Sequence, residues 1–194
     1  MIDNWAEIDA AIRSNDADRV NDAIDRIGAL DLDERLATFD ARFDALASIY
    51  EQSEEGYVRQ SVVRVVDELL PGLPTVTVVD DDDVAETPET VGQRLDTAAG
   101  FLIEALQDDD GRVRQSAQRA LKDVFWGYDA IEDGETVDAI ASELADLADQ
   151  YEGSRRNHLL EAKMDAEHLL GPPGGRLIES IRELVAETNR SDRE

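Results

Sequence analysis

The sequence has no cysteine, and its 194 residues include only two lysines, Lys122 and Lys163. The lack of cysteine excludes disulfide bonds, thiolate metal ligands and a cysteine nucleophile. No apolar run approaches the roughly 18–20 residues that a membrane-spanning helix requires. Residues 1–7 lack the basic start and the apolar stretch of a secretory signal. We therefore expect a cytoplasmic protein with no membrane partner.

Basic charge is scarce throughout the chain. Lysine and arginine together number 19 against 46 aspartates and glutamates, which gives a net charge of −27. The acids are spread along the sequence instead of forming one tail, and aspartate outnumbers glutamate. At molar salt the Debye length is only about 3 Å, so the repulsion among so many carboxylates is screened. We interpret this composition as that of a halophilic source, in which overall acidity says little about the partner.

Apolar residues recur at three- and four-residue steps in most segments, which predicts amphipathic helices. The stripes predict helices over residues 31–50, 57–70, 90–107, 112–125, 136–151, 159–170 and 177–185. The segments between them are short, acidic and glycine-bearing, and we expect Asp or Ser to begin the helices and Gly to end them. One irregular insertion is expected around residues 71–90, because it holds prolines and a β-branched run.

An internal repeat is visible in the sequence. Residues 57–69 align without gaps to residues 112–124, and both segments contain Val-Arg-Gln-Ser followed by a second arginine. Both follow an acidic turn that contains glycine. Weaker copies lie at residues 19–27 and 155–162. The chain is therefore expected to repeat one helical unit.

This pattern of an acidic turn, Val-Arg, a small residue and an apolar pair resembles the second helix of HEAT repeats. The resemblance implies an all-α fold, a short right-handed α-solenoid of stacked antiparallel helix hairpins. The expected single domain covers residues 1–188, with hairpins at 2–30, 33–70, 90–126 and 134–170, a final helix at 176–188 and a frayed tail at 189–194. An ordinary helical bundle with a duplicated segment is the alternative.

The second helices carry nine of the 19 basic residues. The resemblance implies that these helices line a concave surface, where a basic groove would accept an acidic protein segment or a phosphate backbone. Alternatively, the arginines pair with acids of the neighbouring turns, such as Asp109 and Asp110, and stabilise the stack. The candidate partner-binding residues are Arg59, Arg64, Arg112, Arg114, Arg119, Lys122, Arg155 and Arg156.

The remaining motifs do not indicate catalysis. No nucleophile elbow, phosphate loop or dinucleotide fingerprint is present. The aromatic cluster at residues 125–128 could stack on bases or fill space between hairpins. The aspartate run at residues 80–83 lacks the alternating ligands of a calcium loop, and His158 and His168 lack the spacing of a helical metal pair. We expect no catalytic residue, no metal and no cofactor.

These observations favour a non-catalytic protein-interaction or scaffold module that binds an unknown protein partner through its inner helices. A nucleic-acid-associated regulator is a less favoured alternative, because phosphate binding weakens steeply with salt. A HEAT-like enzyme or accessory of lyase or glycosylase type is a further alternative.

Overall fold

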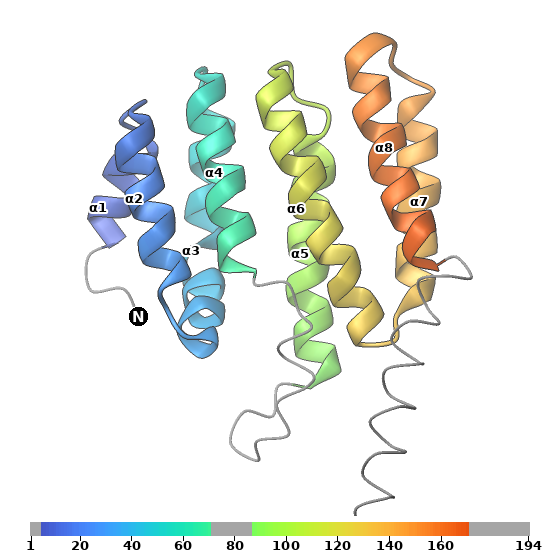
Figure 1. The fold of residues 1–194 in the computed structure, drawn as a ribbon, viewed down its shortest axis with the longest axis horizontal. Helices are drawn as coiled ribbons and strands as arrows, with labels where there is room; N and C mark the ends of the chain where they lie inside the picture. Colours follow the sequence, from blue (N-terminus) through green and yellow to red (C-terminus); the bar gives the residue numbers. More distant parts are fainter. Residues whose placement is uncertain (1–4, 71–86, 171–194) are drawn as a thin grey trace, which may run out of the picture.

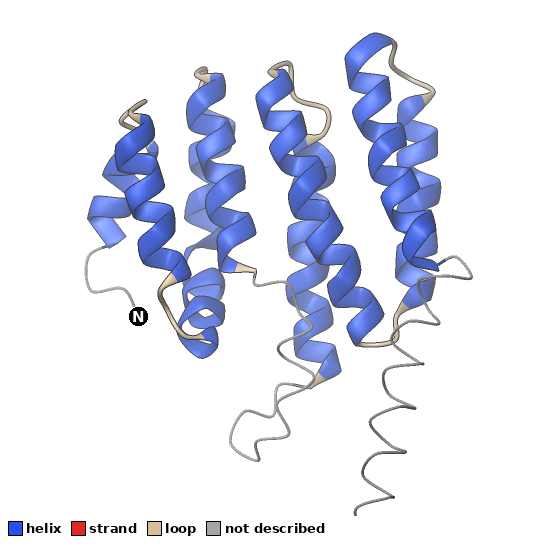
Figure 2. Cartoon of the chain, viewed as in Figure 1, coloured by secondary structure: helices blue, strands red, loops and turns tan. Residues whose placement is uncertain are grey.

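The computed structural model describes residues 5–70 and 87–170, and the regular structure in these ranges is entirely α-helical, with no strand (Figure 2). In chain order the helices are α1 (Trp5–Ile12), α2 (Ala17–Gly28), α3 (Leu32–Gln52), α4 (Gly56–Leu69), α5 (Pro88–Ala105), α6 (Gly111–Ala130), α7 (Gly134–Ala148) and α8 (Gly153–Leu170). The all-α fold class predicted from the apolar periodicity is confirmed.

The helices form antiparallel pairs in two layers (Figure 1). Within the pairs, α1 packs on α2, α3 on α4, α5 on α6 and α7 on α8. The front layer consists of α2, α4, α6 and α8, which contact one another in chain order, while the odd-numbered helices lie behind them. Successive pairs are therefore joined mainly through the front layer.

One hydrophobic core runs through all of these pairs. Its central part includes fully buried valines of α4, such as Val62 and Val66, and Leu121 of α6. Burial of each such side chain stabilises the fold by roughly 1.5–3 kcal/mol. In the rear layer, the ring of Phe101 meets the rings of Phe43 and Tyr50 edge-on, with centroids 5.8 and 5.1 Å away. Aromatic contacts thus connect α3 to α5.

Many acidic residues have a local role at helix starts. Aspartates occupy the N-cap positions of α2, α3, α6 and α7, and the side chain of each accepts a hydrogen bond from a backbone amide of the first turn. Such caps typically stabilise a helix by about 1 kcal/mol. α5 instead begins with Thr87 as N-cap and Pro88 in its first turn, an arrangement that suits proline. Part of the acidic excess is therefore structural.

The expectation that glycine ends the helices is wrong at three of the acidic turns. Gly56, Gly111 and Gly153 are instead the first residues of α4, α6 and α8. A Cβ atom at Gly56 would lie only 2.7 Å from Cγ of Asp110, closer than real Cβ contacts permit. Gly153 has a φ of 64°, which glycine adopts without strain. Gly56 is therefore needed for the close approach of Asp110 and Gly153 for its backbone geometry, and neither glycine ends a helix.

Several predicted segments fall partly or wholly beyond the described ranges. Residues 71–86 of the predicted insertion, the predicted final helix at 176–188 and the tail at 189–194 lie outside the described residues. The last part of the predicted insertion, up to residue 90, belongs to α5, which begins at Pro88.

Candidate functional site

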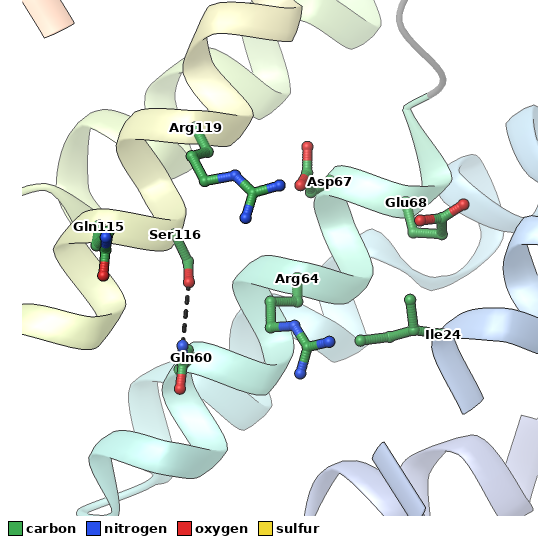
Figure 3. A pocket seen from close by; sticks show the side chains of 8 residues that line it. All are labelled: Ile24, Gln60, Arg64, Asp67, Glu68, Gln115, Ser116 and Arg119. Atoms are coloured by element: carbon green, nitrogen blue, oxygen red, sulfur yellow. Dashed lines mark hydrogen bonds between the residues drawn. The ribbon is translucent and has the colours of Figure 1, made fainter. Parts of the chain in front are cut away.

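A cleft of about 310 Å³ lies on the front layer, between α4 and α6 and beside α2 (Figure 3). Its lining residues are Ile24, Gln60, Arg64, Asp67, Glu68, Gln115, Ser116 and Arg119. The amide Nε2 of Gln60 donates a hydrogen bond of 3.3 Å to the hydroxyl of Ser116 and so connects the two helices. Because all lining residues except Ile24 are polar or charged, the cleft suits a polar ligand.

The lining of the cleft follows the internal repeat. Gln60 and Arg64 on α4 occupy the same repeat positions as Gln115 and Arg119 on α6. Two amides and two guanidinium groups therefore face one space. Figure 3 shows the guanidinium of Arg119 extending from α6 toward Asp67 on α4. The duplication of one pattern thus creates a site that neither copy has alone.

The first arginine of the α4 copy, Arg59, does not reach this cleft. Its Nε and Nη2 atoms donate to the carboxylate of Asp108 at 2.6 and 2.8 Å. The Tyr50 hydroxyl donates to the same carboxylate at 2.7 Å. Burial alone would raise the pKa of Asp108, but these hydrogen bonds, led by the one from Arg59, hold it below its usual value. Arg59 therefore fixes the turn before α6 onto the preceding helix pair.

Arg114, the equivalent residue on α6, is also structural. Its side chain is almost fully buried, with only 7% of the residue exposed. Its Nη1 atom donates to the backbone carbonyls of Asp108 and Asp109, at 2.6 and 2.9 Å. Its Nη2 atom donates to the hydroxyl of Ser154 on α8, at 3.3 Å. Arg114 therefore links its own turn to the next helix pair.

Four more of the candidate basic residues have carboxylate partners. The ion pairs join Arg112 to Asp110, Lys122 to Asp165, Arg155 to Asp109 and Arg156 to Asp149. The guanidinium of Arg155 also lies over the ring of Tyr151, 4.8 Å from its centroid. Arg59, Arg114 and these four residues therefore follow the alternative in which the basic side chains pair with groups of nearby turns and helices.

Arg64 and Arg119 differ from the other six candidates. Within the described ranges, neither guanidinium group has a carboxylate at salt-bridge distance or a backbone carbonyl as hydrogen-bond acceptor, whereas each of the other six basic groups has at least one of these. Arg64 donates to the side-chain oxygen of Asn21 on α2, at 2.9 Å, while the guanidinium of Arg119 makes no hydrogen bond to any described residue. The two guanidinium groups line the same cleft. The candidate set therefore divides into a structural group and a pair that remains available.

Asp67 is the titratable residue of the cleft that the sequence did not single out. Its pKa is raised to about 7, because burial and the charge of Asp123 outweigh the attraction of Arg119. The pKa of Asp123 is also raised, mainly by burial. A sequence signal existed, since Asp67 follows Arg64 by three positions and shares its helix face. It was inconspicuous because the chain contains 46 acidic residues.

The aromatic cluster at residues 125–128 is mostly interior. Phe125 and Tyr128 are each 1% exposed, and the Tyr128 hydroxyl donates to Asp96 at 2.7 Å. These two rings are therefore unavailable for stacking on bases, and the alternative of packing between helices describes them. Among the described residues, no group of three or more His, Cys, Asp or Glu side chains could hold a metal ion. The aspartate run at 80–83 lies outside the described ranges.

Comparison with protein-family models, with curated proteins and with solved structures finds no match for this chain. None of the helices in residues 5–70 and 87–170 combines the length and apolarity needed to cross a membrane. The functional conclusion therefore depends on the cleft and on the residues that line it.

Proposed function

We propose that the protein is a non-catalytic interaction or scaffold module that binds a protein partner at the cleft between α4 and α6. One observation carries the proposal. Of the eight basic candidates on the front layer, only Arg64 and Arg119 have neither a carboxylate nor a backbone carbonyl partner among the described residues, and both line this cleft. Charged groups left available in a concave site are typical of binding surfaces.

We further propose that the chain is a short right-handed α-solenoid of HEAT type. The proposal is supported by the paired helices, by the contacts of the front helices in chain order and by the repeated segments at residues 57–69 and 112–124. A single hairpin cannot bury its apolar face, and stacking of neighbours buries it. Such arrays present an extended surface to partners, which agrees with a scaffold role.

A halophilic source and a cytoplasmic location belong to the same proposal. The net charge of −27 and the presence of only two lysines support the salt-adapted interpretation. In such a protein most carboxylates serve hydration and solubility. On such an acidic surface, the positive charge of two arginines without carboxylate partners contrasts with the surrounding carboxylates more than it would on a surface of average composition.

A protein partner suits the cleft better than nucleic acid. Asp67 and Glu68 lie beside the two arginines, and the other basic candidates have partners of their own. A nucleic-acid backbone presents a row of phosphates, whose binding needs a continuous cationic surface. The front layer instead offers one local cationic spot.

The test compares two double variants with equal loss of charge. Arg64→Gln with Arg119→Gln removes the cleft pair, whereas Arg112→Gln with Arg156→Gln removes two exposed, carboxylate-paired arginines of the same layer. Each protein is used to capture partners from a lysate of the source organism in roughly molar KCl, which screens non-specific attraction. Mass spectrometry identifies the captured proteins, and circular dichroism checks helicity.

We expect the wild type and the control variant to capture the same protein partner, and the cleft variant to lose it by about tenfold or more, the factor for 1.4 kcal/mol. Equal capture by both variants would show that the partner binds elsewhere. Co-purification of nucleic acid that depends on Arg64 and Arg119 would favour the nucleic-acid-associated regulator instead.

A further inference from the structure

The charges around the cleft do not balance as they do elsewhere on the front layer. Glu68 forms an ion pair with Arg35 of α3, at 3.5 Å. The side chain of Asp67 makes no ion pair or hydrogen bond with any described residue, although it faces Arg119 (Figure 3). The cleft therefore contains two guanidinium groups without carboxylate partners and one carboxyl group that competes weakly for them.

Asp67 has two states with opposite effects on an incoming anion. When ionised, it repels the anion and attracts Arg119. When protonated, it is neutral and carries an O–H donor. Its pKa of about 7 places both states within the ordinary pH range. Asp67 and a carboxylate ligand can share one proton and then attract each other, whereas the two groups repel each other when both are ionised.

The other polar groups of the cleft are suited to a carboxylate. The Ser116 hydroxyl accepts the hydrogen bond of Gln60, so its own O–H remains able to donate. The amide of Gln115 is a further donor at the rim. Arginine binds a carboxylate through two parallel hydrogen bonds. The volume of about 310 Å³ accommodates an acidic side chain. A phosphate with two charges would face Asp67 and Asp123 at greater cost.

We propose that the cleft binds a carboxylate of an acidic segment of the partner protein between Arg64 and Arg119, with Asp67 as the neighbouring carboxyl group that opposes this ligand when it is ionised. The inference rests on the proposed function, since it names the chemistry of the partner at the same site. It predicts tighter binding at lower pH, where Asp67 is protonated and donates to the ligand.

The groups that surround Asp67 support this assignment of the pH response. On α4 they are Arg64 and Glu68, and on α6 they are Arg119 and Asp123. From α2 the cleft receives only the neutral Ile24, while Asn21 accepts the hydrogen bond of Arg64. Arginines do not titrate in this range. Asp67 and Asp123 are therefore the carboxyl groups that interact with Arg119, and of these two only Asp67 lines the cleft.

The experiment uses a labelled, C-terminally amidated hexa-aspartate peptide as the probe and the full chain in roughly molar KCl. Fluorescence anisotropy measures its affinity at about pH 8 and about pH 6, where the probe stays ionised because aspartate has a pKa near 3.9. The variants are Asp67→Asn, Arg119→Gln and, as control, Asp44→Asn, which removes an exposed carboxylate from α3 in the rear layer. A hexathymidine oligonucleotide serves as the phosphate probe.

We expect the wild type and Asp44→Asn to bind hexa-aspartate about three- to tenfold more tightly at pH 6 than at pH 8. Asp67→Asn should bind tightly at both values, which is a gain of affinity at pH 8. Arg119→Gln should lose about tenfold at both. If Asp67 had only a structural role, its replacement would not increase the affinity for hexa-aspartate at pH 8.

Three results would overturn the inference. If Asp67→Asn binds hexa-aspartate as weakly as the wild type at pH 8, Asp67 does not oppose the ligand. Tighter, Arg119-dependent binding of hexathymidine would replace the carboxylate by phosphate. No binding of hexa-aspartate at either pH, together with Arg64- and Arg119-dependent capture of a protein, would reject the carboxylate and leave the proposed function standing. If that capture also fails, the proposed function fails with it.

Discussion

In the turn formed by residues 108–110, the pKa values of Asp108 and Asp110 lie below the usual range, whereas those of Asp67 in the cleft and of Asp123, four positions after Arg119 on α6, lie above it. In the turn, hydrogen bonds, led by those from arginines, lower the two pKa values by more than burial raises them. In the cleft, burial acts without such bonds. The turn is therefore stabilised by its charges, while the cleft retains charge that a ligand can satisfy.

The two regions draw on the same repeated sequence. In each copy the first arginine, Arg59 or Arg114, binds the turn, and the second, Arg64 or Arg119, faces the cleft. Five residues separate the two arginines of a copy, which corresponds to about 140° around an α-helix. Within each copy, one arginine thus binds the turn and the other lines the proposed binding site.

Removal of the Asp108 carboxylate should have the largest effect on the turn. Asp108→Ala leaves the half-buried Arg59 without its bidentate partner and deprives the Tyr50 hydroxyl of its acceptor. The Asp108 side chain is only 4% exposed. Loss of one partner of a buried ion pair typically costs about 3–5 kcal/mol. We expect the free energy of unfolding, measured by denaturant titration in constant KCl, to fall by about this amount.

Asp109→Ala is the matched control in the same turn. The side chain of Asp109 is 95% exposed, and it pairs with Arg155. Exposed pairs are worth about 0–1 kcal/mol, so this variant should unfold almost like the wild type. Similar losses for both variants would mean that the turn depends on its overall charge and not on the Asp108 contacts.

The helices were largely predictable from the sequence, because each apolar stripe is local. The prediction for residues 112–125 corresponds to α6, although Tyr128 extends its buried face beyond the predicted end. The starts of the helices were less predictable. Gly56 resembles a helix terminator in sequence, and its role depends on Asp110, which only the packing of the next pair brings near. Periodicity carries no information about such contacts between repeats.

The candidate site was predictable only as a set of residues. The sequence indicated the basic residues of the second helices, but several of their partners lie 40 or more positions away, as in the contacts of Arg59 with Asp108 and of Arg114 with Ser154. Asp67 was not identified because Asp123 and Arg119, the charged groups with the largest effects on its pKa, belong to α6 and are brought near it only by the packing of the two helices. What the sequence could supply was the angular separation of Arg59 and Arg64.

Gly56 provides an intermediate effect on the turn. In Gly56→Ala the new Cβ would displace the side chain of Asp110, which caps α6 and pairs with Arg112. Overpacking and loss of a cap each cost about 1–3 kcal/mol or less, so we expect a decrease of about 1–3 kcal/mol in the free energy of unfolding. Thermal denaturation followed by circular dichroism measures it.

Gly100→Ala is the control for this substitution. A Cβ at Gly100, inside α5, meets nothing within 4 Å. Because alanine favours a helix interior over glycine by about 0.5–1 kcal/mol, this variant should be slightly more stable than the wild type. Destabilisation by both substitutions would indicate that the close approach at Gly56 is not the cause.

The smallest expected effect concerns the pH dependence of stability in the cleft. An unfolded aspartate has a pKa of about 3.9, whereas that of Asp67 in the folded chain is about 7. Between these values the folded state holds the proton that the unfolded state has released, so stability falls as the pH rises from about 4 to about 7. The contribution of Asp108 to stability changes with pH in the opposite direction, because its pKa is lowered in the folded chain. Its contribution is complete above about pH 4 and is lost as the pH falls below that value.

The difference between the wild type and Asp67→Asn isolates the contribution of Asp67 from that of every other titrating group in the chain. Each pKa unit corresponds to about 1.4 kcal/mol, but Asp67 is partly exposed, and solvent and salt screen its charge. We expect the free energy of unfolding of the variant, relative to the wild type, to rise by roughly 1–2 kcal/mol between about pH 4 and about pH 7. Parallel profiles for the two proteins would show that the cleft tolerates an ionised carboxylate as well as the turn does, and the contrast between the two regions would disappear.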